Sequence, residues 1–175
     1  QNIYRIWYDK PASYWEEALP VGNGRIAAMV FGNPQLEQIQ LNEETVSAGS
    51  PYQNYNEEAK TALPEMRRLI FEGKYEEAQN MAATKILSQV GNEMPYQTVG
   101  RLNIRYPDHK KVNNYYRDLD ISNAVAVTRY EVDGVEFTEE TFASFTDQLV
   151  IRHIKASKPG TINCELFFNT PMRDP

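Results

Sequence analysis

Cysteine and histidine are scarce in this sequence, and their scarcity excludes several kinds of site. The 175 residues contain one cysteine, Cys164, and two histidines, His109 and His153. A single cysteine cannot form an internal disulfide, so we interpret Cys164 as a small buried hydrophobic residue of a strand. Two isolated histidines are too few for a zinc site. We therefore expect no metal and no cofactor, and no serine or cysteine stands in the context of a nucleophile elbow.

Long apolar runs and an excess of positive charge are also missing. No run reaches the roughly 18 apolar residues that a membrane-spanning helix needs. The net charge of -6 and the pI of about 5.0 argue against nucleic acid and anionic membrane surfaces as partners. The length suffices for one domain with a sizeable core. Because the chain begins with Gln1 instead of methionine, we expect that a tag, a signal peptide or another upstream segment has been left out.

Short segments with alternating apolar and polar residues dominate the chain. Their regular spacing predicts a mainly β fold, an antiparallel β-sandwich. Asp133-Gly134 is a strong signal for a two-residue hairpin between two of these strands. Residues 57–87 instead carry helical patterns interrupted at Gly73-Lys74, which predicts a helical insertion between strands. The strands are expected at residues 3–8, 26–31, 36–41, 102–106, 116–121, 124–132, 135–145, 148–156 and 161–168.

The stretch from Trp15 to Gly32 ends an acidic lead-in with Gly22-Asn23-Gly24-Arg25 and continues into an apolar run. A phosphate-binding loop would be longer and would precede a helix, whereas the apolar run looks like a buried strand. Two interpretations remain open. The four residues form a hairpin turn, or they place Asn23 and Arg25 on an edge that faces a ligand.

A second polar segment follows the expected strand at 36–41. Asn42, Glu43 and Glu44 come directly after it and precede a glycine-rich turn. Polar groups at a strand end are commonly solvated caps. We nevertheless predict Asn42 and Glu43 as candidate substrate-binding residues, together with Asn23 and Arg25.

Two segments of the chain are ALPVGNGRIAAMVFG at 18–32 and IQLNEETVSAGSP at 39–51. They resemble the N-terminal domain of glycoside hydrolase family 95, the 1,2-α-L-fucosidase type. The family motifs have the form LPxGNGRxGAMVFG and IQLNExTxWxGxP. This sequence departs from them at Ala27, where glycine is usual, and at Val46-Ser47, where leucine and tryptophan are common. The resemblance continues along nearly the whole chain.

The resemblance implies a domain arrangement and an activity. The 1–175 segment would be an N-terminal β-sandwich of the supersandwich type, incomplete at its C-terminal end. The catalytic carboxylates of the family lie in a later (α/α)6 barrel that has no counterpart here, so this chain alone is expected to be inactive. The parent enzyme would hydrolyse terminal α-L-fucosyl linkages with inversion. Fucosidase and L-galactosidase activity are not separated, and a periplasmic or secreted location is implied.

Carboxylates are plentiful in the chain, but their pattern does not indicate a catalytic pair. The candidates are Glu16-Glu17, Glu43-Glu44, Asp118, Asp120 and Glu139-Glu140. Neighbouring residues on a strand point to opposite faces, so each adjacent pair is a poor acid and base couple. We expect most of these carboxylates to be solvated, and we interpret the segment around His109 and Lys110 as a solvated loop. No catalytic residue is predicted.

The leading hypothesis is that the chain packs against the catalytic barrel of the same polypeptide and walls one side of a cleft that receives fucosylated glycans. The four candidate residues would face this cleft, or they would bind loops of their own domain. A second hypothesis is a self-standing carbohydrate-binding module. Its stacking platform would consist of the aromatic residues Trp7, Tyr8, Tyr14 and Trp15. A third is a structural scaffold whose exposed strand edges pair in a homodimer.

Overall fold

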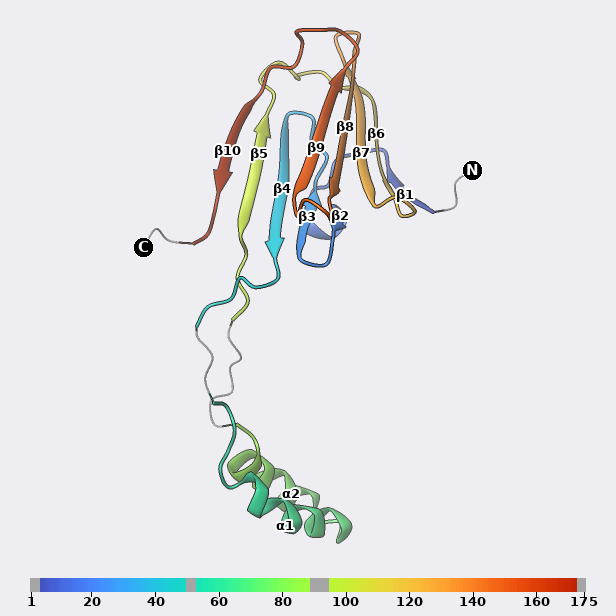
Figure 1. The fold of residues 1–175 in the computed structure, drawn as a ribbon. Coiled ribbons are helices and arrows are strands. Elements are labelled where there is room, and N and C mark those ends of the chain that lie inside the picture. The colour runs from blue at the N-terminus through green and yellow to red at the C-terminus, as the bar shows by residue number, and fades with distance from the viewer. Residues whose placement is uncertain (1–3, 50–52, 89–94, 173–175) are drawn as a thin grey trace. The chain divides into compact units, whose positions relative to one another are not determined.

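The computed structural model describes residues 4–49, 53–88 and 95–172. The chain divides into two compact units, of which the first comprises Gln1–Val46 and Gln97–Pro175 and the second comprises Ser47–Tyr96. The first unit is built of strands and the second of helices (Figure 1). The candidate residues Asn23, Arg25, Asn42 and Glu43 all belong to the first unit.

The first unit is a sandwich of two antiparallel sheets, which confirms the predicted fold class. The first sheet has the order β1 (Arg5–Tyr8), β6 (Asn113–Asp120), β7 (Val125–Val132), β8 (Val135–Ala143) and β9 (Val150–Ala156). The second sheet has the order β10 (Glu165–Asn169), β5 (Gly100–Arg105), β4 (Leu36–Glu43), β3 (Ile26–Val30) and β2 (Leu19–Gly22). A 3₁₀ turn, η1 (Trp15–Glu17), lies in the connection between β1 and β2.

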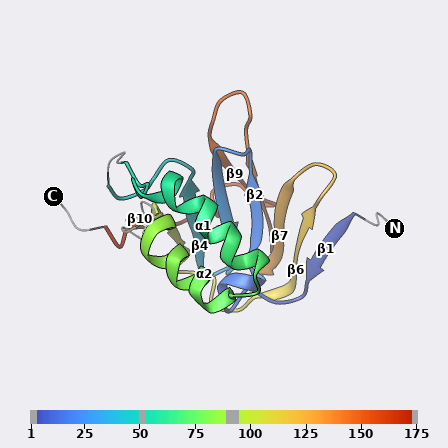
Figure 2. The ribbon, with the colours of Figure 1, turned by 90° about the horizontal axis from the view of Figure 1, so that it is seen from below.

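The second unit contains the helices of the predicted insertion. These are α1 (Ala59–Phe71), α2 (Tyr75–Met81) and a π-helical turn, η2 (Ala82–Ile86). The sequence pattern predicted that the second helix continues to residue 87. Helix α2 instead ends at Met81, and η2 follows it. Helix α1 packs against α2 and η2, and the two helices lie side by side in Figure 2. Leu69 and Ala78 are the buried residues of α1 and α2 among the described side chains.

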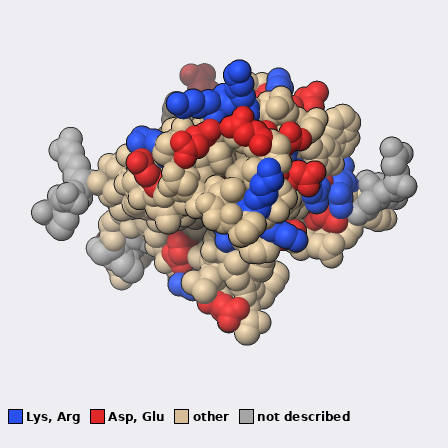
Figure 3. All heavy atoms as spheres, turned by 90° about the horizontal axis from the view of Figure 1, so that it is seen from above, with Lys and Arg blue, Asp and Glu red and all other residues tan. Residues whose placement is uncertain are grey.

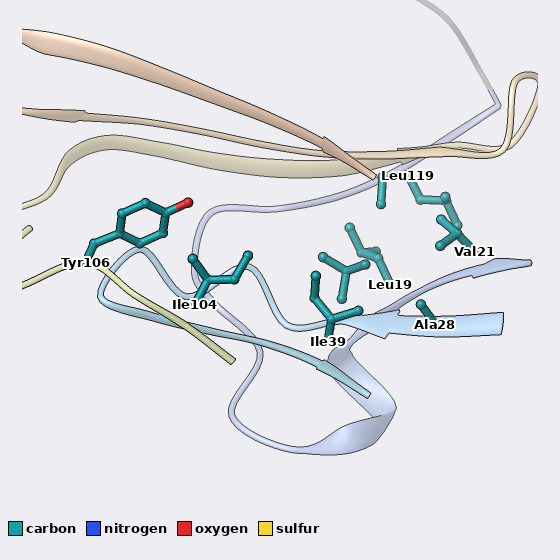
Figure 4. Close-up of a cluster of buried hydrophobic side chains, with 9 residues drawn as sticks. Leu19, Val21, Ala28, Ile39, Ile104, Tyr106 and Leu119 are labelled. Atoms are coloured by element: carbon teal, nitrogen blue, oxygen red, sulfur yellow. The ribbon is translucent and has the colours of Figure 1, made fainter. Parts of the chain in front are cut away.

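The core of the sandwich lies between the inward faces of the two sheets. Because side chains alternate along a strand, every second residue of each strand points inward. Figure 4 shows these side chains meeting between the ribbons of the two sheets. The buried cluster consists of Leu19, Val21, Ala28, Val30, Ile39, Ile104, Tyr106, Leu119 and Ala126.

The two sheets are offset sideways. Strand β2 packs against β6, β7 and β8, and β3 packs against β8 and β9. Strands β5 and β10 therefore extend beyond β9, the edge of the first sheet, as Figure 1 shows. This offset leaves part of the inward face of the second sheet uncovered.

Most predicted strands are confirmed, with differences at their ends. Strand β3 pairs with β4, and the hairpin between Val132 and Val135 is as predicted. Strand β4 continues through Glu43, so Asn42 and Glu43 lie within the strand and not after it. The strand predicted at 161–168 begins only at Glu165, and half-buried Cys164 lies just before it, packed against the core. Ile3 of the first predicted strand lies outside the described residues.

No helix in the described ranges has the length and apolar character needed to cross a membrane. Basic and acidic side chains lie next to one another on the face drawn in Figure 3.

Candidate functional site

The segment Gly22-Asn23-Gly24-Arg25 is a hairpin turn between β2 and β3. Gly22 pairs with Ala27, and the backbone N–H of Asn23 donates to the carbonyl of Ile26 at 3.1 Å. The side-chain Oδ1 of Asn23 accepts from the N–H groups of Arg25 at 3.0 Å and Ile26 at 2.9 Å. Asparagine is suited to this local bonding. The hairpin interpretation is therefore confirmed for this segment.

The amide nitrogen of Asn23 ties this hairpin to the other sheet. Nδ2 donates to the carbonyl of Ser144 at 2.8 Å and lies 3.4 Å from Oε1 of Gln148. Both residues belong to the loop between β8 and β9, and Asn23 itself is only 9% exposed. Both polar ends of the Asn23 side chain thus bind loops of the domain.

The other three candidate residues lie beside this hairpin. The register pairs Ile26 with Glu43 and Ala27 with Asn42, which brings the end of β4 next to the hairpin. Arg25 Nε lies 3.2 Å from Glu43 Oε1, and the Arg25 side chain is 53% exposed. The structure therefore brings all four candidates to one end of the second sheet.

Glu43 is held as a carboxylate by its neighbours. Its Oε2 accepts from the hydroxyl of Thr45 at 2.6 Å and from the backbone N–H of Thr45 at 2.8 Å. These two hydrogen bonds, together with the nearby Arg25, lower the pKa of Glu43. A carboxylate with a lowered pKa is a poor general acid at neutral pH. Glu43 can accept hydrogen bonds at this end of the sheet, but it is not suited to protonating a leaving group.

An apolar hollow of about 330 Å³ adjoins these residues, between β9 and the inward face of the second sheet. Its polar lining comes from Asn42, Glu43, Gln148 and Arg152. Its remaining lining residues are Ile26, Ala27, Ile39, Leu41, Val99, Leu102, Leu149 and Val150. The hollow lies beside β9, the edge strand of the first sheet, where the offset of the sheets leaves β4 and β5 only partly covered.

A buried ionic cluster lies between the two sheets, and the sequence reasoning missed it. Arg152 of β9 donates from Nη2 to Glu37 of β4 at 2.8 Å and to Glu139 of β8, and from Nη1 to the hydroxyl of Thr141 at 2.8 Å. The two carboxylate side chains are 0% and 1% exposed, and that of Arg152 is 7% exposed. The sequence did contain a signal for this position. Glu37 has the same parity as Ile39 and Leu41 in the strand, so it points inward with them.

The pKa values in this cluster follow from burial and from the shared guanidinium. Burial raises the pKa of Glu37, and the repulsion of Glu139 adds to this, although Arg152 acts in the opposite direction. Burial alone would lower the pKa of Arg152, but the attraction of Glu37 and Glu139 outweighs it and raises the pKa. Both carboxylates bind the same guanidinium nitrogen inside the sandwich and are closed to solvent. This arrangement fits a stabilising cluster and leaves no place for a sugar.

His109 extends the buried polar region, although the loop around it is solvated as predicted, with Asp108, Lys110 and Lys111 exposed. His109 is 3% exposed and stacks on Tyr106, with ring centroids 4.6 Å apart. Its Nδ1 lies 3.1 Å from the carbonyl of Pro34 and 3.2 Å from the hydroxyl of Tyr130, which donates to Glu139 at 2.9 Å. Burial lowers the pKa of His109. His109 alone of residues 107–111 is buried, which the polar composition of this loop did not indicate.

Asp118 and Asp120, which were also expected to be solvated, are buried. Asp118 is 0% exposed and Asp120 is 8% exposed, although both lie on the outward face of β6. Arg5 of the neighbouring strand bridges them, at 3.1 Å from Asp118 and 3.2 Å from Asp120. Cross-strand ion pairs of this kind cover the carboxylates and remove them from solvent. In the described residues, no group of His, Cys, Asp and Glu could hold a metal ion.

The four aromatic residues of the proposed stacking platform do not share one face. Trp7 points outward from β1, 61% exposed, with its ring 6.3 Å from that of Tyr116. Tyr8 has the opposite parity and lies under the guanidinium of Arg117, 4.1 Å from it. Tyr14 and Trp15 follow in the connection between β1 and β2. Trp7 and Tyr8 therefore cannot stack on the same sugar.

We expect Asn23→Ala to destabilise the sandwich by about 1–2 kcal/mol, because it removes hydrogen bonds at both ends of a buried side chain. Arg25→Ala, the control in the same hairpin, removes one exposed ion pair and should change the free energy of unfolding by less than about 1 kcal/mol. Urea unfolding followed by tryptophan fluorescence measures both variants. Equal effects of the two substitutions would show that Asn23 does not hold the hairpin to the β8–β9 loop.

Comparison with known proteins identifies the family. The family model described as glycosyl hydrolase family 65, N-terminal domain, matches residues 6–175. Alpha-L-fucosidase 2 of Arabidopsis thaliana is 37% identical over 96% of this chain and 20% of its own length. Two proteins named probable alpha-fucosidase A, from Aspergillus niger and Aspergillus oryzae, are 26% and 24% identical over 87% of this chain and over 20% and 22% of their own lengths.

The chain spans about a fifth of the length of the curated relatives that it matches. The family match and the fucosidase relatives together confirm the resemblance to the N-terminal domain of the family 95 fucosidases. The chain belongs to the family of glycosyl hydrolase family 65 N-terminal domains.

Proposed function

We propose that this domain is a non-catalytic part of an enzyme that hydrolyses terminal α-L-fucosyl linkages with inversion. Its role is to pack against the catalytic barrel of the same polypeptide and to wall one side of the active-site cleft. The fucosidase names of its relatives support the activity. The burial of Glu37, Glu139 and Asp118 supports the non-catalytic role, because these carboxylates are closed to a substrate.

The observation that carries the packing role is the uncovered inward face of β10. Leu166 pairs with Ile104 and Phe168 pairs with Leu102, so their side chains point to the same side of the sheet as the core. They are nevertheless 65% and 51% exposed, because β10 extends beyond the first sheet. Burying two such side chains contributes roughly 1.5–3 kcal/mol each. A further part of the polypeptide that covers β10 would gain this free energy.

The candidate cleft wall is the end of the second sheet where Arg25, Asn42 and Glu43 lie. Arg25 is half exposed, and Glu43 is a carboxylate with a lowered pKa. Such groups can donate to and accept from sugar hydroxyls without taking part in proton transfer. Asn23 supports this wall by fixing the hairpin that carries Arg25.

The test compares this chain with the longer polypeptide that includes the barrel. We expect the longer protein to release L-fucose from fucosylated oligosaccharides, with the β-anomer as first product, and the 175-residue chain to release none. NMR spectroscopy of the reaction mixture measures both the activity and the anomer. A full-length enzyme with no activity on fucosyl substrates, or an active isolated domain, would refute the proposal.

The packing role has its own test in the longer protein. Leu166→Ser combined with Phe168→Ser should lower the melting temperature of the full-length enzyme, because the two serines no longer bury apolar surface against the part of the polypeptide that covers β10. Phe71→Ser, at an 88% exposed position of α1, is the control and should have little effect. A double variant that melts like the control would argue against packing at β10.

A further inference from the structure

A polar hollow of about 510 Å³ lies on the outward face of the second sheet. Its volume is in the range of small-molecule sites. Most of its lining side chains carry an amide, a hydroxyl or a guanidinium. The lining residues are Gln38, Gln40, Thr98, Gly100, Arg101, Asn103, Asn169, Thr170 and Pro171.

The sheet register arranges these groups in rows. Arg101 of β5 pairs with Gln40 of β4 on one side and with Asn169 of β10 on the other, so the three side chains stand abreast on one face. Gln38 and Asn103 form the next row on the same face. Neighbouring strands are about 4.8 Å apart, and side chains of one face recur every ~7 Å along a strand. The rows therefore present hydrogen-bonding groups across an area that suits a pyranose ring.

The floor of the hollow is fixed by a buried amide. Asn103 is 3% exposed, and its Nδ2 donates to Oδ1 of Asn169 at 2.7 Å. This bond occupies the oxygen of Asn169 and orients its side chain, so that the amide N–H groups of Asn169 remain as donors. A donor held by a buried partner loses little conformational freedom on binding.

Arg101 gives the hollow its charge. It is the one charged residue in the lining, and the structure gives its guanidinium no ion pair or hydrogen bond within residues 4–49, 53–88 and 95–172. Arg105, on the same face of the same strand, differs in this respect. It is paired with Glu165 at 3.1 Å and lies over the ring of Phe167.

We propose that this hollow binds a uronate residue of a glycan. The sugar carboxylate lies against the guanidinium of Arg101, which presents parallel N–H donors suited to a carboxylate. The ring hydroxyls bond to the amides of Gln38 and Gln40, which both donate and accept, and they accept from the amide N–H groups of Asn169. The uncharged L-fucosyl group lacks the carboxylate, so this site goes beyond the proposed function and does not depend on it.

The test is a titration of the ¹⁵N-labelled 175-residue chain with methyl galacturonoside, followed by NMR spectroscopy. The matched neutral probe is methyl galactoside, which differs only at the carboxylate. We expect saturable shifts of amides in β4, β5 and β10, with the neutral sugar binding at least tenfold more weakly. Inorganic phosphate is the third probe, and it should bind at least tenfold more weakly than the uronate.

Variants on one strand assign the carboxylate contact. Arg101→Met should lower the uronate affinity at least tenfold and leave the two sugars bound equally, whereas Arg101→Lys should keep part of the preference. Arg105→Met is the control and should change the affinity by less than twofold. Gln40→Leu should weaken both sugars. The dispersion of the amide spectrum shows that each variant is folded.

Three results would overturn the proposal. These are the absence of uronate binding by the folded chain, phosphate binding as tight as that of the uronate, and equal losses in Arg101→Met and Arg105→Met. The second result would indicate a general anion site. None of them bears on fucosidase activity of the longer protein, so the two proposals fail separately.

Discussion

Arg152→Met is expected to destabilise the sandwich by about 3–5 kcal/mol at neutral pH, the range for breaking a buried ion pair by removing one partner. Arg152 is the cation that Glu37 and Glu139 share between the sheets, and all three side chains are nearly inaccessible. Methionine fills a similar space but leaves both carboxylates without a counter-charge. Urea unfolding followed by the fluorescence of Trp7 and Trp15 measures the loss, because both tryptophans lie in the sandwich unit.

The loss in this variant should depend on pH. Burial already raises the pKa of Glu37 in the folded protein, and removal of Arg152 raises it further. A carboxyl group whose pKa is higher in the folded than in the unfolded state binds more protons when folded. Its stability contribution is therefore present below the unfolded pKa and is lost as the pH rises through the folded pKa. The destabilisation by Arg152→Met should accordingly be smaller near pH 5 than near pH 8.

Two further variants separate the charge from the packing of the cluster. Adding Glu37→Gln and Glu139→Gln to Arg152→Met removes both unpaired charges, and we expect the triple variant to regain part of the stability. Arg105→Met removes an exposed ion pair with Glu165 and should change the stability by less than about 1 kcal/mol. If Arg152→Met were as mild as Arg105→Met at every pH, the cluster would not contribute to stability.

Gly32→Ala is expected to destabilise the sandwich by about 2–5 kcal/mol. Gly32 has a φ of +74°, a left-handed conformation that disfavours an L side chain by roughly 1–2 kcal/mol. An added Cβ would also lie 2.8 Å from the hydroxyl of Tyr115 and 2.9 Å from Cδ of Arg117. Displacing these packed groups costs about a further 1–3 kcal/mol. Their movement would also disturb the hydrogen bond from Tyr115 to the carbonyl of Gly32, at 2.6 Å.

Gly24→Ala is the matched control for this substitution. Gly24 lies in the hairpin turn at the other end of β3, with a φ of +93°, but among the described residues no atom beyond its chain neighbours lies within 4 Å of the position its Cβ would take. The control therefore retains the backbone strain and lacks the steric clash. The free energies of unfolding of the two variants, measured in urea, should differ by about 1–3 kcal/mol. Equal values would mean that Tyr115 and Arg117 move aside without loss.

Local features of this fold could be predicted from the sequence, because they depend on neighbours in the chain. The alternation at Ile39 and Leu41 fixed the inward face of β4, and Asp133-Gly134 fixed the hairpin that joins β7 and β8. The Asn-Gly turn at Asn23 was one of two open interpretations, and its backbone geometry is that of the predicted hairpin. The motif around it also carried the family resemblance that the comparisons confirm.

The candidate site could be predicted only in part. The sequence grouped Asn23 with Arg25 and Asn42 with Glu43, and the register of β3 and β4 brings the two pairs together. It did not reveal that Asn23 binds Ser144, which lies 121 residues away in the chain. It also missed Arg101 and its neighbours, because the hollow forms only where β4, β5 and β10 lie side by side.

The sequence by itself determined most of the strands, the helical insertion and the family of this protein, since these depend on residue type and spacing. The tertiary structure alone decided which polar groups are buried. Alternation shows that Glu37 shares a face with Ile39, but its contact with Arg152, 115 residues away, depends on how the two sheets are offset. The same offset exposes Leu166 and Phe168, because the packing of the sheets decides which inward-facing residues are covered.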